Sequence, residues 1–414
     1  MRVLMFGWEF APVVAGGLGV VCRSLSHNLA NNGVDVTFVL PKIPRAVHEE
    51  KLTIVNASES EVDVSSVEYI EVESLLSPYL NVADFEKMSK ELKEKPSQES
   101  SSEMYGADLS GEVLKFAVRA LDIARKVKHD VIHAHDWMTF KAAANAKSVS
   151  GKPLVVHIHA TEFERTADNP DPIIYEYERS GMEVADKVIA VSEKTKKKIA
   201  YHYGIPRKKI EVVHNAVDES KKVKTKPILT PGLKRVVPTV LFLARLAPSK
   251  GADFLLRAAK KVLSINKDVQ FVFVGKGSMK EELVDLSLEL GINGNVIFPG
   301  FLENSRVDRA YRQADLFVMP SIAEPFGITA LEAMRNGTPV LMSKQSGASE
   351  VVRNALKVDF WDIDEMANKI LAVLNHSSLA KTLSEYGYHD LQKMDWDTQS
   401  KKVIGIYTAL AHDF

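Results

Sequence analysis

Short, mostly apolar runs alternate along the chain with longer segments in which apolar residues recur every three or four positions. Runs of the first kind cover residues 3–6, 240–244 and 315–319, and each is followed at once by glycine, arginine or proline. Segments of the second kind include residues 18–30 and 252–263. Buried parallel strands read as unbroken apolar runs, whereas amphipathic helices show the longer period. The alternation therefore predicts an α/β fold in which helices cover parallel sheets.

The length of 414 residues exceeds that of one ordinary hydrophobic core. We expect two α/β domains of about 200 residues each. The first is predicted to occupy residues 1–218, and the second residues 239–395. Between them, residues 219–238 are basic, contain prolines and show no hydrophobic period, which is typical of a linker.

Composition narrows the class of protein. A hydrophobic content of 45 % is typical of a globular enzyme, and a net charge of -1 gives no overall field that would attract nucleic acid or a membrane surface. The single cysteine, Cys22, excludes an intramolecular disulfide and is expected in the core of a helix. The first apolar run is broken by Gly7 and Glu9, and no later run has the length of a membrane span. We expect a cytoplasmic protein without a membrane span.

The stretch Pro320–Glu350 has the residues of a ligand site. A strand ends at Pro320, a loop with the sequence IAEPFG follows, and a helix is predicted from Ile328 to Asn336. Free amides at such a helix start, together with the helix dipole, bind anions. The candidate amides are those of Phe326, Gly327, Ile328 and Thr329.

Two carboxylates flank these amides. Glu324 precedes the helix and Glu332 lies more than one turn inside it, so both could accept hydrogen bonds from sugar hydroxyls. A sugar diphosphate needs an anion site and such acceptors together. The alternative is that Glu324 only complements the helix dipole and that Glu332 only pairs with Arg335.

The spacing E-x7-E beside Pro325-Phe326-Gly327 resembles the signature of retaining GT-B glycosyltransferases, the group that includes glycogen and starch synthases. At least five segments agree with this group in order, from the first strand to the last helix. The resemblance implies two Rossmann-like domains that face a central cleft. It also implies that the last helix, within residues 396–414, packs back on the first domain.

Two cations follow the first strand of the second domain. Arg245 and Lys250 are five residues apart at a strand end, where Arg can hold a phosphate as a fork and Lys as a point charge. Solvated surface charge is the alternative, but the segment FLARLAPSKG resembles the R-x4-K segment of the family. Further along, Gly277 belongs to a G-K-G turn that lies near the nucleoside in the family.

Two further strand ends, VIHAHDW and LVVHIHA, each carry H-x-H, and alternation directs both histidines of a pair to one face. A metal site has to be weighed against histidines buried under the sheet, since no cysteine cluster or carboxylate completes a ligand set. A third reading is that Asp136 and His159 emerge at the carboxyl ends of parallel strands, where open α/β sheets bind ligands. The resemblance implies that His159 contacts the transferring sugar and that Asp136 lies beside the acceptor hydroxyl.

The first turn carries Gly16 and Gly17, which allow close backbone approach to a ligand or serve packing alone. A dehydrogenase would add G-x-G-x-x-G here and an acid after the second strand. Neither is present, which argues against a nicotinamide cofactor. Bacterial glycogen synthases carry a phosphate-contacting lysine in this turn, and Val14 stands at its place, which weakens an assignment to ADP-glucose.

Two further segments are not assigned to the predicted ligand site. Residues 81–105 are polar and are expected to form a surface loop whose role the sequence leaves open. The motif Asp362-Ile363-Asp364 has the form of the D-x-D used by metal-dependent sugar transferases, but it precedes an amphipathic segment and is predicted to cap a helix.

Together these features and the resemblance predict a metal-independent hexosyltransferase that needs no cofactor, and the resemblance alone implies retention of the anomeric configuration. We expect it to move glucose from a nucleoside diphosphate sugar to a glucan. The alternatives are a transferase that makes a disaccharide or another glycoside from a UDP- or GDP-sugar, a sugar-nucleotide epimerase, and a noncatalytic sensor of sugar nucleotides. The nucleotide base, the acceptor and the oligomeric state stay open.

Overall fold

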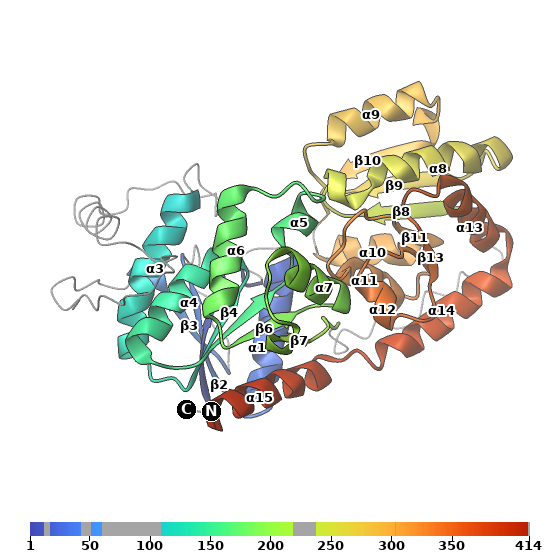
Figure 1. The fold of residues 1–414 in the computed structure, drawn as a ribbon. Helices are drawn as coiled ribbons and strands as arrows, with labels where there is room; N and C mark the ends of the chain where they lie inside the picture. The colour runs from blue at the N-terminus through green and yellow to red at the C-terminus, as the bar shows by residue number, and fades with distance from the viewer. Residues whose placement is uncertain (12–16, 43–50, 60–108, 218–236, 303, 413–414) are drawn as a thin grey trace.

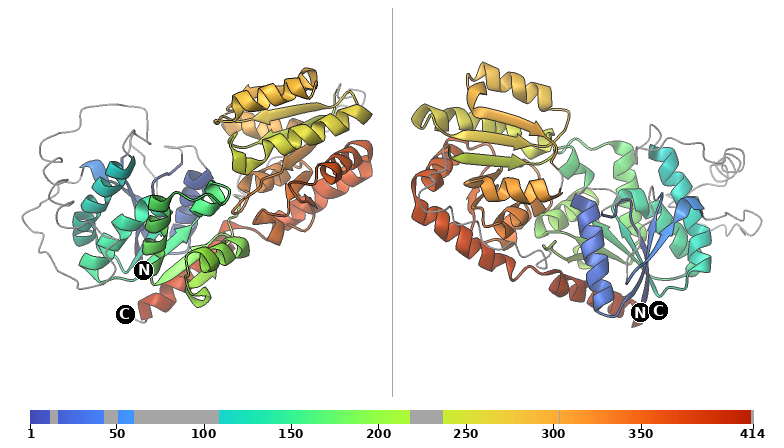
Figure 2. Two further views of the ribbon diagram at one scale, coloured as in Figure 1. Left: turned by 45° about the horizontal axis from the view of Figure 1, so that its top comes forward. Right: turned by 180° about the vertical axis from the view of Figure 1, so that it is seen from behind.

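The computed structural model describes residues 1–11, 17–42, 51–59, 109–217, 237–302 and 304–412, and they form two α/β units side by side (Figure 1). Each unit is built on one parallel sheet with helices against it (Figure 2). The expectations for Val14, for Gly16 and for residues 81–105 lie outside the described residues, as does nearly all of the expected linker 219–238.

The first sheet has seven strands in the order β3-β2-β1-β4-β5-β6-β7, all parallel. The order reverses between β1 and β4, as in Rossmann-type sheets. The strands are β1 (Arg2–Phe6), β2 (Asp35–Leu40), β3 (Thr53–Asn56), β4 (Val131–His135), β5 (Leu154–Ile158), β6 (Lys187–Ala190) and β7 (Ile210–Val212).

Both faces of this sheet are covered, as alternate residues of β1 show. Leu4 and Phe6 belong to one apolar cluster, and Val3 and Met5 belong to another. The helices of this unit are α1 (Gly17–Asn31), α3 (Leu109–Lys126), α4 (Trp137–Ser150), α5 (Glu162–Arg165), α6 (Pro172–Val184) and α7 (Glu193–His202). Burial on both faces explains why the strands read as continuous apolar runs. Cys22 is fully buried on α1, as predicted.

The second sheet has six parallel strands in the order β10-β9-β8-β11-β12-β13, with its reversal between β8 and β11. Its strands are β8 (Thr239–Leu243), β9 (Gln270–Val274), β10 (Val296–Gly300), β11 (Leu316–Met319), β12 (Val340–Ser343) and β13 (Leu356–Val358). Its helices are α8 (Ala252–Ile265), α9 (Lys280–Glu289), α10 (Asn304–Gln313), α11 (Ile328–Arg335), α12 (Ala348–Val351), α13 (Ile363–Asn375) and α14 (Ser377–Leu391). The fold is therefore α/β with two parallel sheets, as the sequence predicted.

The last helix, α15 (Trp396–His412), runs from the second unit to the first (Figure 1). Trp396, Val403, Tyr407 and Leu410 are buried in the same apolar cluster as α1. Asn32, just after α1, donates a hydrogen bond of 2.9 Å to Asp397. The C-terminal helix thus supplies part of the core of the first unit. Within the described residues, no helix is both long and apolar enough to cross a membrane.

Candidate functional site

Both sheets present candidate residues at the carboxyl ends of their central strands. Asp136 follows β4 and His159 follows β5 closely, in the first unit. In the second unit Arg245 comes shortly after β8, and Glu324 lies in the loop after β11. Open α/β sheets bind ligands at this edge, next to the point where the strand order reverses. The candidate site therefore consists of one half on each unit.

The half on the second unit is centred on an ion pair between Lys250 and Glu324. The Nζ of Lys250 lies 2.8 Å from Oε2 of Glu324, and both side chains are only 17 % and 13 % exposed. The hydroxyl of Ser321 donates to the same Oε2 at 3.2 Å. Within the described residues, Oε1 accepts no hydrogen bond, so it can face a ligand hydroxyl.

A glycine turn brings Lys250 to this position. Gly251 has φ +65°, and a Cβ at this residue would lie 2.1 Å from the carbonyl oxygen of Pro320. Only glycine combines that backbone conformation with so close an approach. The turn after β8 can therefore pack directly on the end of β11, where Glu324 follows.

Arg245 is exposed and, among the described residues, forms no ion pair. Its neighbour Leu246 donates from its amide to the carbonyl of Lys276 at 2.9 Å. A Cβ on Gly277 would lie 2.1 Å from the carbonyl oxygen of Leu246, so packing between the two loops already requires a glycine there. The structure brings Gly277 next to the loop of Arg245, and the role of Gly277 at a nucleoside stays a prediction.

The loop between Glu324 and α11 presents the expected amides. Gly327 has φ +107° and its added Cβ would lie 3.3 Å from Cγ of Glu324, so the loop folds back over that side chain. In the part of the chain that the structure describes, the four candidate amides donate to no other group; they belong to Phe326, Gly327, Ile328 and Thr329. They remain available to an anion at the start of α11.

Glu332 lies inside α11 and contacts α10. The hydroxyl of Tyr311 donates to Oε2 of Glu332 at 3.2 Å, and Arg335 pairs with Asp308 at 3.0 Å. Glu332 is therefore held by neighbouring polar groups of the second unit. Its use as a ligand for the donor stays a prediction.

The half on the first unit joins Asp136 to His159. Oδ1 of Asp136 accepts the backbone amide of His159 at 2.7 Å. Asp136 has φ 58° and ψ 167°, a strained conformation for a residue with a side chain. Burial raises the pKa of Asp136 to about 6, although Arg165 and the amides of His159 and Ala160 oppose this effect. The carboxylate thus fixes the loop that carries His159, and a contact with an acceptor hydroxyl stays a prediction.

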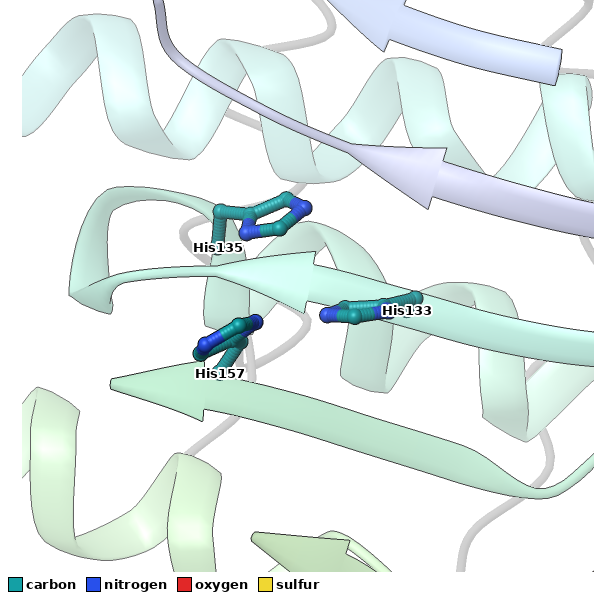
Figure 3. Close-up of side chains that lie close together, drawn as sticks. All are labelled: His133, His135 and His157. Atoms are coloured by element: carbon teal, nitrogen blue, oxygen red, sulfur yellow. The ribbon is translucent and has the colours of Figure 1, made fainter. Parts of the chain in front are cut away.

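His159 is partly exposed and forms a group of four histidines with three buried ones, His133, His135 and His157, which Figure 3 draws. Nδ1 of His135 and Nε2 of His159 are 2.9 Å apart and share a hydrogen bond. Nδ1 of His133 forms a hydrogen bond with the hydroxyl of Tyr407. Burial lowers the pKa values of His133 and His159 to about 3 and that of His157 well below its usual range. The group is therefore neutral near pH 7.

The same group was weighed above as a metal site. Nitrogen atoms of His133, His135 and His157 lie within 4.8 Å of one another. The rings stack, however, with planes 23° apart for His133 and His135 and 29° apart for His133 and His157. Nearly parallel, stacked rings direct their in-plane lone pairs past one another, whereas the ligands of a tetrahedral metal ion converge on one point. The geometry therefore favours neutral imidazoles packed around His159.

Arg165 was missed as a supporting residue. Its guanidinium donates to the carbonyl of Ala160 at 2.6 Å and pairs with Glu162 at 2.9 Å and with Glu178. Before it, Thr161 and Glu164 form a capping box at the start of α5. The T-x-x-E spacing was legible in the sequence, but the approach of Glu178 on α6 was not, because it depends on tertiary packing.

The predicted cap at Asp362 is confirmed. Its Oδ1 accepts the amide of Glu365 at 3.0 Å at the start of α13, and Asp364 pairs with Lys261. Both carboxylates of the motif are thus accounted for by a helix start and a surface ion pair.

Comparisons with known proteins agree with this geometry. Residues 2–208 match the starch synthase catalytic domain family, which is half of the chain, and residues 231–390 match the glycosyl transferases group 1 family. The chain therefore belongs to the GT-B glycosyltransferases and carries a starch synthase-type catalytic domain.

Several relatives are similar over nearly the whole chain, as three of them illustrate. An uncharacterized glycosyltransferase of Methanocaldococcus jannaschii is 29 % identical over 98 % of both chains. A glycogen synthase of Mycobacterium tuberculosis is 25 % identical, over 99 % of this chain and 95 % of its own. A D-inositol 3-phosphate glycosyltransferase of Nocardioides is 26 % identical, over 98 % of this chain and 89 % of its own.

Many solved structures share the fold, as two of them illustrate. Sucrose-phosphate synthase from Thermosynechococcus elongatus superposes with a TM-score of 0.75 at 20 % identity, over 100 % of both chains. HepE from Anabaena, solved in complex with UDP and glucose, superposes with a TM-score of 0.67 at 19 % identity, over 99 % of both chains.

Proposed function

We propose that this glycosyltransferase moves glucose from a nucleoside diphosphate sugar to a glucan, with retention of the anomeric configuration and without a metal ion. The observation that carries the proposal is the Lys250–Glu324 pair beside the available amides at the start of α11. A cation and amides suit a diphosphate, and a carboxylate with one open oxygen suits a sugar hydroxyl.

In the proposed reaction, the bond between the anomeric carbon and the diphosphate oxygen breaks and the acceptor oxygen bonds to the same face of the carbon. The acceptor proton passes to the departing diphosphate, which leaves as a nucleoside diphosphate. Negative charge therefore develops on the phosphate oxygens. Lys250, Arg245 and the amides after Glu324 would stabilise it, and one such preorganised contact is worth roughly 3 kcal/mol of barrier.

On the first unit, we propose that neutral His159 contacts the transferring glucose and that Asp136 lies next to the incoming hydroxyl. The low pKa of His159, about 3 because of burial, means that the imidazole would act as a hydrogen-bonding group without a charge. Glu332 would hold the ribose of the donor, with Gly277 near its base and Gly17 near its phosphates.

Support for a glucan acceptor comes from the starch synthase family match and from the glycogen synthase relative. Support for a nucleotide-sugar donor comes from HepE, whose structures hold UDP, glucose and UDP-glucose. The inositol phosphate glycosyltransferase relative supports a second candidate, transfer to a small phosphorylated acceptor.

The test is a matrix of ADP-, UDP- and GDP-glucose against glycogen, maltooligosaccharides, glucose and inositol phosphate, read by release of nucleoside diphosphate. We expect release that depends on a glucan, and NMR of the product should show an α-linkage. Release only with inositol phosphate would favour the second candidate. An altered donor without acceptor would show an epimerase, and binding without turnover would show a sensor.

A further inference from the structure

The start of α12 is bonded to the donor loop through the backbone. The amide of Gly347 donates to the carbonyl of Glu324 at 3.0 Å, and the amide of Ala348 donates to the carbonyl of Phe326 at 2.6 Å. A Cβ on Gly347 would lie 2.1 Å from the carbonyl oxygen of Pro325. Any displacement of the loop that carries Glu324 therefore displaces α12.

Glu350, on the same short helix, reaches the first unit. Its carboxylate accepts the amides of Glu193 and Lys194, both at 2.8 Å, at the start of α7. The hydroxyl of Ser192 accepts the next amide, that of Thr195, at 3.1 Å. Glu350 thus supplies, from the other unit, the acceptors that the first turn of α7 lacks in its own sequence.

Glu350 is only partly exposed and stays ionised. Burial acts to raise its pKa, but the nearby His214 and the hydrogen bonds from the amides of Glu193 and Lys194 outweigh burial and lower the pKa below its usual value. Nε2 of His214 lies 3.6 Å from Oε2 of Glu350, and the ring of His214 lies 5.9 Å from that of Phe326 in the donor loop. Donor loop, α12 and first unit therefore meet at one place.

From α7 the contacts continue to His159. The hydroxyl of Thr195 donates to Oε1 of Glu164 at 2.9 Å, and Oε2 of Glu164 accepts the amide of Thr161 at 2.8 Å. Thr161 is two residues beyond His159. An unbroken series of hydrogen bonds and short backbone links thus connects the loop of Glu324 on one unit with the loop of His159 on the other.

We propose that Glu350 is a positioning residue for transfer, which sets the place of His159 relative to the donor held by the second unit. The proposal rests on the function proposed above. Glu350 itself contacts no reacting atom. It acts by fixing α7, and through α7 the Thr161–Glu164 turn, to the same backbone that carries Glu324.

The test compares Glu350→Ala with Glu350→Gln, which keeps one acceptor oxygen, and with a control, Asp362→Ala. The control also removes a carboxylate from a helix start, but the whole contact lies inside the second unit. We expect Glu350→Ala to lower kcat by about tenfold to 100-fold, the scale of a misplacement of ~1 Å. Glu350→Gln should recover part of the loss, and Asp362→Ala should leave kcat unchanged.

Binding of the nucleoside diphosphate product separates positioning from a general loss of structure. Because its proposed ligands other than Gly17 lie on the second unit, its Kd by calorimetry should change less than about threefold in Glu350→Ala. An equal loss of affinity and of kcat, or a kcat equal to that of the wild type, would overturn the positioning role.

Hydrogen exchange gives a readout that needs no donor. The amides of Glu193 and Lys194 should exchange faster in Glu350→Ala than in the wild type and the control. If the wild type transfers no sugar from any donor, the proposed function fails, while this comparison still decides whether Glu350 holds the two units together. Unchanged exchange would contradict the contact itself.

Discussion

At the scale of residues, the site pairs the proposed catalytic groups, except the exposed Arg245, with partners that restrict them. Lys250 is paired with Glu324, and His159 is held through its amide by Asp136 and through its ring by His135. Such partners fix side chains before a substrate arrives, which lowers the cost of ordering them in the transition state. Mutating one member of such a pair is therefore the most direct test of the proposed site.

Replacing Lys250 with Ala should lower kcat by about 100-fold, because one charge on the departing diphosphate loses its partner, worth roughly 2.7 kcal/mol of barrier. The matched control is Lys261→Ala. Lys261 also pairs with an acid, Asp364, on the second unit, but at the surface. Steady-state kinetics of both variants check this prediction, and near-normal turnover of Lys250→Ala would exclude Lys250 from the mechanism.

The pH profile should report Asp136. Its pKa of about 6, raised by burial, means that the carboxylate gains a proton as the pH falls through 6 and then accepts the amide of His159 less strongly. We expect kcat to fall on the acid side of about pH 6 in the wild type. Asp136→Asn keeps Oδ1 and cannot titrate, so its lower activity should be flat across this range. The same acid limb in the variant would assign it to another group.

At this scale the sequence predicted which residue types stand at the strand ends, but not their partners. Asp136, His159, Arg245 and Glu324 could be placed at the carboxyl edges because each follows an apolar run. The contact of His135 with His159 joins two strands, and the pairing register that creates it is set by the whole sheet. The sequence showed that the glycines form turns. It did not show which backbone segment each turn contacts.

At the scale of elements, two glycines with the same backbone conformation have different surroundings. Gly251 has φ +65° and lies against Pro320, whereas Gly151, which ends α4, has φ +66° and nothing within 4 Å of an added Cβ. The conformational cost of alanine is therefore shared by both sites, and only Gly251 adds a clash.

Gly151→Ala should cost about 1 kcal/mol of unfolding free energy from the left-handed conformation alone. Gly251→Ala should cost about 3 kcal/mol, because the turn must also move away from β11. Since Lys250 moves with that turn, only Gly251→Ala should lower kcat as well. Urea unfolding and kinetics of the two variants check this, and equal effects at both sites would show that the close approach to Pro320 does not matter.

The elements themselves were the most predictable part of the molecule. The predicted strands at 3–6, 240–244 and 315–319 agree with β1, β8 and β11 to within one residue or so at their ends. The period of apolar residues follows the pattern of burial. Strands covered on both faces and long amphipathic helices can therefore both be recognised in the sequence. The four-residue helix α5 was missed although its capping box is local, because four residues are too few to show a hydrophobic period. The backbone contacts of α12 with the loop of Glu324 were not predictable, because they join residues distant in the sequence.

At the scale of the whole molecule, α15 ties the end of the chain to the first sheet. Tyr407 is fully buried, and its hydroxyl is the hydrogen-bonding partner of Nδ1 of His133 on β4. Nothing in the local sequence of α15 indicates that partner, and only the resemblance to known proteins predicted where this helix would lie.

Tyr407→Phe should lower the unfolding free energy by about 1–3 kcal/mol, since it leaves a buried imidazole nitrogen without a partner and keeps the ring in place. The control is Tyr386→Phe on α14, where the side chain is 54 % exposed and the change should stay within about 0.5 kcal/mol. Urea unfolding of both variants measures the difference. Equal stability of the two would mean that the hydroxyl of Tyr407 contributes nothing to the docking of α15.

The return of α15 to the first sheet also bears on the order of events during synthesis. One apolar face of the leading unit is completed by Trp396, Val403, Tyr407 and Leu410, which follow the whole second unit in the sequence. Domains generally fold in order as they emerge. Here the leading unit keeps an open apolar face until the second unit and α15 have been made, so a product truncated just before Trp396 should be open to proteolysis although every proposed catalytic residue is present.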